Sequence, residues 1–208
     1  MSCCALVAAS DFNADDFERR RAAGTFDYVI AVDGGLASLR QVGCAPDLVL
    51  GDFDSLGFVP EGENVVVHPT HKDASDLQLA LEECAARGFD SVVVYGALGG
   101  RLDHTIGCLQ TCACFAERGH DVQLVGIQQA VCILVGPGFF DIPRAEQGTV
   151  SVFSATDESI GVTEQGLEYP LKNACLTNRT TLGLSNELTG VPASVAVESG
   201  TLYIVYPA

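Results

Sequence analysis

The chain has 208 residues, 48% of them hydrophobic, and carries a formal net charge of -16 from 27 acidic and 11 basic residues. This length allows one large domain or two small ones with a sizeable core. The acidic balance excludes binding of nucleic acid or anionic membrane surfaces through clustered Lys and Arg, but not binding of a phosphorylated small molecule bridged by a metal ion.

Cysteine usage and the start of the chain indicate the compartment. The nine cysteines are an odd number, with no C-x-x-C pair and no His partner at zinc spacing. We interpret them as small buried hydrophobes in a reducing compartment. The start lacks the basic and apolar regions of a signal peptide, and no apolar run approaches the ~20 residues of a membrane span. We therefore expect a cytoplasmic protein.

The first two-thirds of the chain alternate between apolar runs and helical patterns. The runs predict buried strands at 4–9, 28–32, 48–50, 65–68, 92–95 and 122–125. Helical patterns lie between them at 15–23, 36–42, 75–87 and 101–118. The third helix has a capping box that starts at Ser75. This alternation predicts a parallel sheet covered by helices on both faces.

The pattern changes after about Gly136. Short, partly alternating segments rich in Thr and Val follow, at 149–153, 159–163, 174–177, 194–198 and 202–206. Such segments, separated by turn residues, predict an antiparallel β-sandwich. We therefore predict an α/β protein, with an N-terminal parallel α/β sheet domain over 1–136 and a C-terminal antiparallel β-sandwich domain over 137–208.

The run at 48–50 is followed by Gly51 and two carboxylates, Asp52 and Asp54. Asp-x-Asp in a loop can turn both side chains toward one point, which is how carboxylates share Mg²⁺. A plain polar turn is the alternative, because Asp and Gly are favoured in turns.

Charged residues recur after the other predicted strands. They are Asp33, Asp73, Asp76, Arg101, Asp103 and His104. Parallel strands would bring them, with Asp52 and Asp54, to one sheet edge, where ligands bind. Converging carboxylates repel one another, and Lys72 and Arg101 are too few to balance them. The sequence therefore predicts a divalent metal carrying a polyphosphate at this edge.

The helix predicted to begin at Arg101 follows Gly99 and Gly100. A helix N-terminus favours an anion, and Arg101 can add two hydrogen bonds to a phosphate. The structural alternative is a turn with a solvated Arg101, with Asp103 as a dipole partner and His104 as an ordinary helix-start residue. For Asp73 and Asp76 the alternative is helix capping. The sequence contains neither a P-loop nor a G-x-G-x-x-G motif, so it is not an ordinary P-loop kinase or dinucleotide oxidoreductase.

Four segments, in this order and spacing, resemble the thiamine pyrophosphokinase family. They are Asp33-Gly34-Gly35, Gly51 to Ser55, Lys72 to Leu77 and Gly99 to His104. Three later segments resemble the thiamine-binding β-domain of that family: Gly161 to Thr163, Gly166 to Leu171 and Gly183 to Glu187. The resemblance covers nearly the whole chain.

The resemblance implies that ATP and thiamine, as partners, give thiamine diphosphate and AMP. It implies a Mg²⁺ site at Asp52, Asp54 and Asp76, and catalytic roles for Asp73, Asp76, Arg101 and Asp103. It implies a nucleotide site at Asp33, Gly34, Gly35, Asp54, Ser55, Arg101 and His104. It implies a thiamine site at Thr163, Ser185 and Asn186, and a homodimer that binds thiamine between its subunits.

This sequence departs from the family pattern in places. Ser75 stands where the family often has Thr, which keeps a capping hydroxyl. Cys108 stands where Asn is frequent, so a polar contact is in doubt, and the chain has no Trp. Three alternatives stay open: a diphosphokinase acting on another hydroxymethyl acceptor such as a pterin, a non-catalytic thiamine or nucleotide sensor, and a metal-dependent phosphohydrolase.

Overall fold

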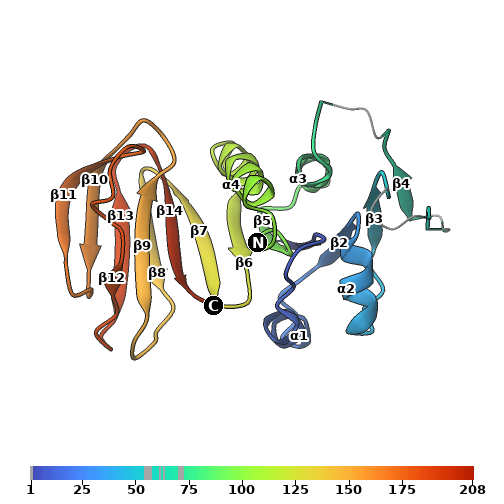
Figure 1. Cartoon of the computed structure of the whole chain (residues 1–208), viewed down its shortest axis with the longest axis horizontal. Helices are drawn as coiled ribbons and strands as arrows, with labels where there is room; N and C mark the ends of the chain where they lie inside the picture. Colours follow the sequence, from blue (N-terminus) through green and yellow to red (C-terminus); the bar gives the residue numbers. More distant parts are fainter. Residues whose placement is uncertain (1, 54–57, 61, 63, 70–72) are drawn as a thin grey trace. The chain divides into compact units, whose positions relative to one another are not determined.

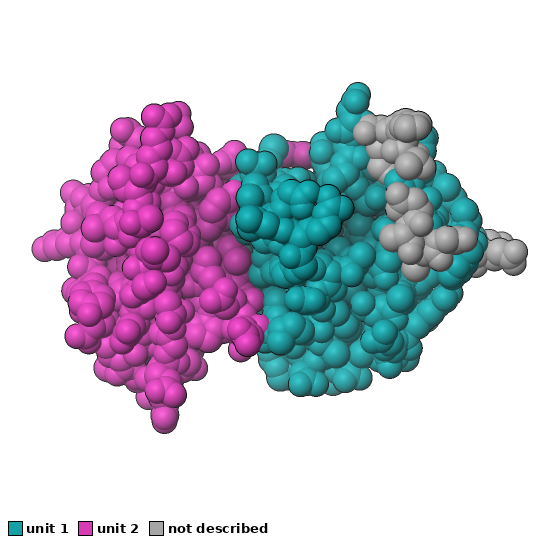
Figure 2. Space-filling view, in the orientation of Figure 1, with its two compact units in different colours: residues 1–115, 120–127 teal, residues 116–119, 128–208 magenta. Residues whose placement is uncertain are grey.

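The computed structural model describes residues 2–53, 58–60, 62, 64–69 and 73–208. The chain divides into two compact units. The first unit is residues 1–115 and 120–127, and the second unit is residues 116–119 and 128–208 (Figure 2). In the described part of the chain, no helix is long and apolar enough to cross a membrane.

The first unit contains a parallel sheet in the order β6-β5-β1-β2-β3-β4 (Figure 1). Its strands are β1 Cys3–Val7, β2 Tyr28–Val32, β3 Leu48–Gly51, β4 Val65–Val67, β5 Ser91–Tyr95 and β6 Asp121–Val125. The predicted parallel sheet is confirmed. The chain moves from β1 outward to β4 and then returns to β5 on the other side of β1. The carboxyl end of β1 is therefore a topological switch point, where such sheets bind ligands.

The helices of the first unit are α1 Ala14–Ala22, α2 Gly35–Gln41, α3 Asp76–Ala86 and α4 Leu102–Ala116. The α3 helix begins where the capping box predicts it, because the Ser75 hydroxyl accepts a hydrogen bond from the Gln78 amide at 3.2 Å. Its buried residues are Leu77, Ala80, Leu81 and Cys84, as helical spacing predicts.

The expected burial is confirmed for six of the nine cysteines and wrong for two. Six are buried: Cys3, Cys4, Cys44, Cys84, Cys108 and Cys112. Cys132 is half-buried, whereas Cys114 and Cys175 are exposed. Cys114 lies on α4 two residues from the buried Cys112, so the helical turn carries it to the outer face.

The second unit is built from two antiparallel sheets, ordered β12-β9-β14-β7 and β11-β10-β13-β8 (Figure 1). The strands are β7 Gln129–Val135, β8 Gly138–Ile142, β9 Thr149–Ser154, β10 Glu158–Gln165, β11 Leu171–Thr177, β12 Asn186–Glu187, β13 Ala193–Val197 and β14 Thr201–Pro207. The predicted antiparallel C-terminal architecture is confirmed.

Two strands of the second unit, β7 and β8, come before the first C-terminal strand predicted from the sequence, at 149–153. β7 pairs along its whole length with β14, from Gln129 opposite Pro207 to Val135 opposite Thr201. The second unit therefore includes residues from 128 onward. The expected boundary at 136 falls in the turn between β7 and β8, inside this unit. The sequence analysis assigned no element to the apolar run 129–135, although Gly126 separates it from the strand predicted at 122–125.

Candidate active site

A cavity of about 580 Å³ opens in the first unit, at the carboxyl ends of β1, β2 and β3. Its walls come from the residues that follow these strands, from the start of α3 and from the first half of α4. Six charged or titratable residues that the sequence places after strands line it: Asp33, Asp52, Asp76, Arg101, Asp103 and His104. The structure therefore brings together side chains that lie up to 71 positions apart in the sequence, from Asp33 to His104.

Backbone geometry brings Asp33 and Asp52 into neighbouring positions. Asp33 follows β2 with a φ of 48°, and its amide donates to the Leu50 carbonyl of β3 at 2.8 Å. A Cβ on Gly51 would lie 3.0 Å from the Asp33 Cα, so any larger residue would press on the Asp33 backbone at this close approach. Asp52 follows directly and lines the same cavity. Two carboxylates from adjacent strands thus face one space.

Part of the acidic motif lies outside the described residues. Asp54, Ser55 and Lys72 are the residues concerned. The sequence analysis assigned Asp54 to the metal and nucleotide sites and Ser55 to the nucleotide site. Phe53 precedes them with a φ of 60° and is 2% exposed. This buried aromatic anchors the chain just after Asp52.

The start of α3 separates two acids that the sequence analysis grouped. Asp76 is the first residue of the helix, is half-buried and lines the cavity. Asp73 is exposed and is not among the described residues that line it. Asp76 also lies in the first turn, where a carboxylate is favoured by the helix dipole. The structure thus places Asp76 both as a dipole partner and as a cavity acid.

Arg101 and Asp103 form a bidentate ion pair at the start of α4. Arg101 Nε donates to Asp103 Oδ1 at 3.2 Å, and Nη2 donates to Oδ2 at 2.7 Å. The hydrogen bonds from Arg101 lower the pKa of Asp103 to about 2, so both groups are charged at neutral pH. The side chains are 80% and 70% exposed. A phosphate entering the cavity would compete with Asp103 for the same guanidinium donors.

One face of α4 forms a cavity wall. His104, Cys108 and Thr111 lie at spacings of four and three residues and all line the cavity. Cys108 is buried, and burial raises its pKa to about 11. The group is therefore a neutral thiol near neutral pH, and it offers only a weak hydrogen bond.

The second glycine after Asp33, Gly35, has a structural role in packing. A Cβ on Gly35 would overlap the Val7 carbonyl of β1, so glycine lets α2 start close to the sheet. Neither Gly34 nor Gly35 is among the described residues that line the cavity. The backbone at Gly35 thus comes close to strand β1.

In the second unit, the side chain of Asn186 is fully occupied by internal hydrogen bonds. Its Nδ2 donates to Glu164 Oε2 and to the Tyr169 carbonyl, both at 2.8 Å. Its Oδ1 accepts from the amides of Tyr169 and Glu187, both at 2.9 Å. The side chain is 4% exposed. This arrangement joins the loops around 169 and 186.

The two neighbouring candidates present hydroxyl groups. Ser185 is exposed, has a φ of 59°, and its amide donates to Ser151 Oγ at 3.0 Å. Thr163 Oγ1 accepts a hydrogen bond from the Asn173 amide at 3.1 Å. Thr163, Ser185 and Asn186 all belong to the second unit, whereas the acidic residues of the cavity belong to the first.

Sequence reasoning missed Glu164, which is 0% exposed. Its Oε1 accepts no hydrogen bond from any described residue, and burial raises its pKa. Alternation along β10 would have placed it outside, but the register with β11 shifts between Ile160 and Val162 and again before Glu164. The signal was Gly161, whose φ of 73° is typical of a β-bulge.

Within the described ranges, no three His, Cys, Asp or Glu side chains are grouped so that they could hold a metal ion. Asp54 lies outside those ranges. Asp52 and Asp76 supply carboxylate oxygens to one cavity, the donor type that Mg²⁺ prefers. Their chemistry therefore fits a hard divalent cation.

Comparison with known proteins agrees with both units. The family model "Thiamin pyrophosphokinase, catalytic domain" matches residues 20–124, and "Thiamin pyrophosphokinase, vitamin B1 binding domain" matches residues 140–202. Thiamine pyrophosphokinase from Bacillus subtilis is 30% identical over 183 residues, 85% of each chain. Thiamin pyrophosphokinase 1 from Caenorhabditis elegans is 26% identical over 175 residues, 78% of this chain and 72% of that one.

Solved structures show the same fold. The crystal structure of thiamine pyrophosphokinase from Bacillus subtilis matches with a TM-score of 0.81 and 25% identity, covering 100% of this chain and 99% of that one. Thiamin pyrophosphokinase from Geobacillus thermodenitrificans matches with a TM-score of 0.80 at 24% identity, covering 99% and 97%. Since the catalytic-domain model alone matches about half of the chain, the chain belongs to the thiamine pyrophosphokinase family.

Proposed function

We propose that the cavity of the first unit binds ATP with Mg²⁺, and that the chain transfers the pyrophosphoryl group of ATP to the hydroxyl of thiamine. The observation that carries this proposal is the convergence of Asp33, Asp52, Asp76 and Arg101 on one cavity at the carboxyl edge of the sheet. Family membership supports thiamine as the acceptor.

Bond making and breaking would be as follows. The thiamine hydroxyl oxygen attacks the β-phosphorus of ATP, and the bond from that phosphorus to the oxygen bridging the α-phosphate breaks. AMP leaves with the bridging oxygen, and thiamine diphosphate forms. The hydroxyl proton passes to a carboxylate, and our candidate is Asp73, which stands at the cavity's edge in the sequence, next to the lining residue Ala74. Most of the rate then comes from positioning and charge stabilisation.

Each charged residue of the cavity has a proposed role. Asp52, Asp76 and Asp54 would hold Mg²⁺, which when bound neutralises charge on the polyphosphate. Arg101 would leave Asp103 and bind oxygens of the transferred group through two parallel hydrogen bonds. Before the nucleotide binds, Asp103 would hold the Arg101 guanidinium in place through the two hydrogen bonds seen in the structure.

The nucleotide and thiamine contacts complete the proposal. Asp33 and His104 line the cavity and would border the nucleotide, with Ser55 and the backbone at Gly34 and Gly35 nearby in the chain. In the second unit, the hydroxyls of Ser185 and Thr163 would contact thiamine, and Asn186 would act by fixing the loop that carries Ser185. We also propose a cytoplasmic homodimer in which thiamine binds between subunits.

The test is to incubate the protein with ATP, Mg²⁺ and thiamine and to identify the nucleotide product by chromatography. AMP together with thiamine diphosphate is the expected result. ADP would contradict pyrophosphoryl transfer. AMP formed only when a hydroxymethylpterin replaces thiamine would overturn the choice of acceptor, and AMP and pyrophosphate released without any acceptor would indicate a phosphohydrolase.

The dimer needs a separate experiment. Subunits carrying Arg101→Ala and subunits carrying Ser185→Ala are each expected to be weakly active alone. If thiamine binds between subunits, mixing them restores part of the activity, because one hybrid site has both residues. No recovery, together with a monomeric mass in solution, would contradict the dimer.

A further inference from the structure

The glycine turn before α4 lies against the segment that follows β1. Beyond the paired strands β1 and β5, the Ala8 amide donates to the Tyr95 carbonyl and the Ser10 amide donates to the Gly96 carbonyl, both at 2.9 Å. These two bonds extend the contact past the end of the sheet. The turn that leads to Arg101 is thus built on a neighbouring loop as well as on its own strand.

Two hydroxyl groups from different elements reach one carbonyl oxygen in this turn. Ser10 Oγ donates to the Gly99 carbonyl at 3.0 Å, with the Leu98 carbonyl as a longer alternative at 3.4 Å. Thr105 Oγ1 lies 3.2 Å from the same Gly99 oxygen and 3.3 Å from the Arg101 carbonyl, so its one proton is shared between them. Ser10 comes from the loop after β1, whereas Thr105 lies in the first turn of α4. The Gly99 carbonyl is therefore held from two sides.

The turn needs such support because its backbone is intrinsically adaptable. Gly99 and Gly100 have φ values of 89° and 65°, in the left-handed region that glycine enters without strain. A Cβ on Gly99 would overlap the Asp11 carboxylate, and one on Gly100 would lie 3.0 Å from Ser10 Oγ. Two glycines can adopt many other conformations, so the hydrogen bonds select the one that precedes Arg101.

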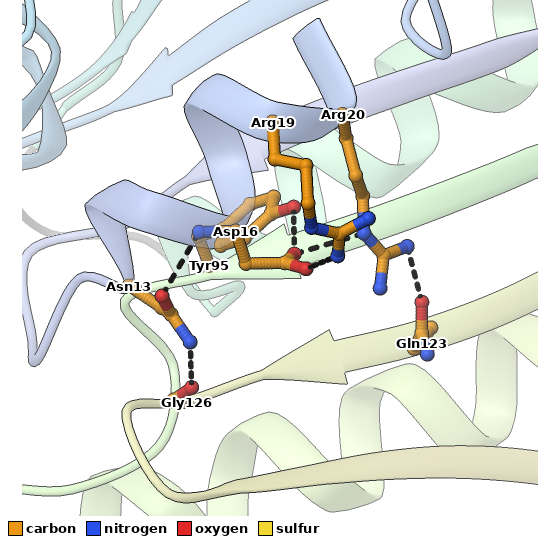
Figure 3. Close-up of polar contacts among 7 residues, drawn as sticks. All are labelled: Asn13, Asp16, Arg19, Arg20, Tyr95, Gln123 and Gly126. Carbon is orange, nitrogen blue, oxygen red and sulfur yellow. Dashed lines mark hydrogen bonds and ion pairs between the residues drawn. The ribbon is translucent and has the colours of Figure 1, made fainter. Parts of the chain in front are cut away.

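The loop that carries Ser10 is itself fixed at its far end (Figure 3). Asn13 Nδ2 donates to the Gly126 carbonyl after β6 at 2.8 Å, while Asn13 Oδ1 caps α1 by accepting from the Asp16 amide at 3.1 Å. The buried Tyr95 hydroxyl donates to Asp16 Oδ2 at 2.7 Å. Burial and Asp16 raise the pKa of Tyr95, which stays a protonated donor.

We propose that Ser10, together with Thr105, is a positioning residue that holds the Gly99 carbonyl and thereby sets the direction of the Arg101 side chain. This inference rests on the proposed function, because it gives Arg101 the transferred group as its target. Among the described residues that line the cavity, neither Ser10 nor Thr105 occurs. We therefore expect the two hydroxyls to act through Arg101.

The experiment measures kcat and KM for Ser10→Ala, alone and combined with Arg101→Ala. Ser10→Ala should lower kcat about 10-fold or more and leave the KM for thiamine unchanged, because a misplaced catalytic group costs rate before binding. Ser10→Thr keeps the hydroxyl and should retain most of the activity. In the Arg101→Ala background, Ser10→Ala should have almost no further effect.

A matched control removes another hydrogen bond from a serine hydroxyl to a backbone carbonyl. It lies at the amino end of β5, whereas Gly99 follows the carboxyl end of this strand. Ser91 Oγ donates to the Ser2 carbonyl at 3.3 Å at the amino end of β5. Ser91→Ala should leave kcat unchanged. An unchanged kcat in Ser10→Ala would overturn the proposal. So would an equal loss of kcat on adding Ser10→Ala to the wild-type protein and to the Arg101→Ala variant.

The failure of the proposed function is distinguishable from failure of this inference. If the wild-type protein forms no AMP from ATP and thiamine, the proposed function fails. Positioning is then judged by amide hydrogen exchange at Gly100 and Arg101. Faster exchange in Ser10→Ala but not in Ser91→Ala would support it, and equal exchange in all three proteins would overturn it.

Discussion

The two units use buried and half-buried polar groups in opposite ways. In the first unit, Asp33, Asp52 and Asp76 line a cavity together with Arg101. In the second unit, Glu164 and Asn186 are buried and bond to each other inside the protein. Polar groups that face a cavity can exchange their partners for a ligand, whereas a buried network holds loops in place. This difference separates the residues expected to affect turnover from those expected to affect stability.

Asp52→Asn should have the largest effect. The substitution keeps the shape of the side chain and removes one negative charge from the proposed metal site, so turnover should fall by roughly 100-fold to 1,000-fold. Steady-state kinetics with increasing Mg²⁺ measure this, and the half-saturating Mg²⁺ concentration should rise. The control is Asp121→Asn, an exposed acid at the amino end of β6. Near-normal turnover in Asp52→Asn would remove the cavity from the mechanism.

Arg101→Ala should lower turnover by roughly 100-fold, and Arg101→Lys should recover only a small part. Lysine restores the charge but lacks the planar pair of donors that Arg101 now presents to Asp103 at 3.2 and 2.7 Å. Arg87→Lys is the control, since this arginine makes a single bond to Glu83 at 2.7 Å on α3. Equal activity of Arg101→Lys and the wild-type protein would argue against bidentate binding of phosphate.

Asn186→Ala should act mainly on stability. It removes four hydrogen bonds and leaves Glu164 Oε2 buried without its donor, which should lower the free energy of unfolding by about 2–3 kcal/mol. Urea unfolding measures this. Asn178→Ala is the control, because Asn178 makes one exposed bond to Asp157 at 3.2 Å. A loss no larger than that of the control would show that the network does not stabilise the unit.

Glu164→Gln should have the smallest effect, visible as a change in pH dependence. Burial raises the pKa of Glu164 above its ordinary value of 4.5, so the folded state binds this proton more tightly than the unfolded state. Its contribution to stability is full below pH 4.5 and is lost as pH rises through the folded pKa. Unfolding experiments at several pH values should show this loss in the wild-type protein and not in Glu164→Gln. Identical pH slopes would contradict a raised pKa.

The sequence predicted most of the first unit because its signals are local and consistent. Apolar runs that end in acids identified the strands, and the shared direction of parallel strands predicted that Asp33, Asp52 and Asp76 would meet. Asp73 is exposed and is not among the described residues that line the cavity, although the next residue, Ala74, is. Nothing in the sequence pattern separates Asp73 from Asp76, since only three positions divide them.

The second unit was predicted less completely. Its antiparallel strands were recognised by alternation, but bulges along β10 reverse the alternation and bring Glu164 inside. Ser10 was also missed, because a single Ser after a strand is common and its partner, the Gly99 carbonyl, lies 89 positions away. Contacts of this range depend on the assembled sheet, which a local pattern does not encode.

The most direct measurement is the affinity for ATP with Mg²⁺, determined by calorimetry for the wild-type protein, Asp52→Asn and Glu164→Gln. We expect Asp52→Asn to bind at least about 10-fold more weakly, because a cavity acid loses its charge, and Glu164→Gln to bind as the wild-type protein does, because its network is buried in the second unit. Equal affinities of the wild-type protein and Asp52→Asn would contradict a nucleotide site in the acidic cavity.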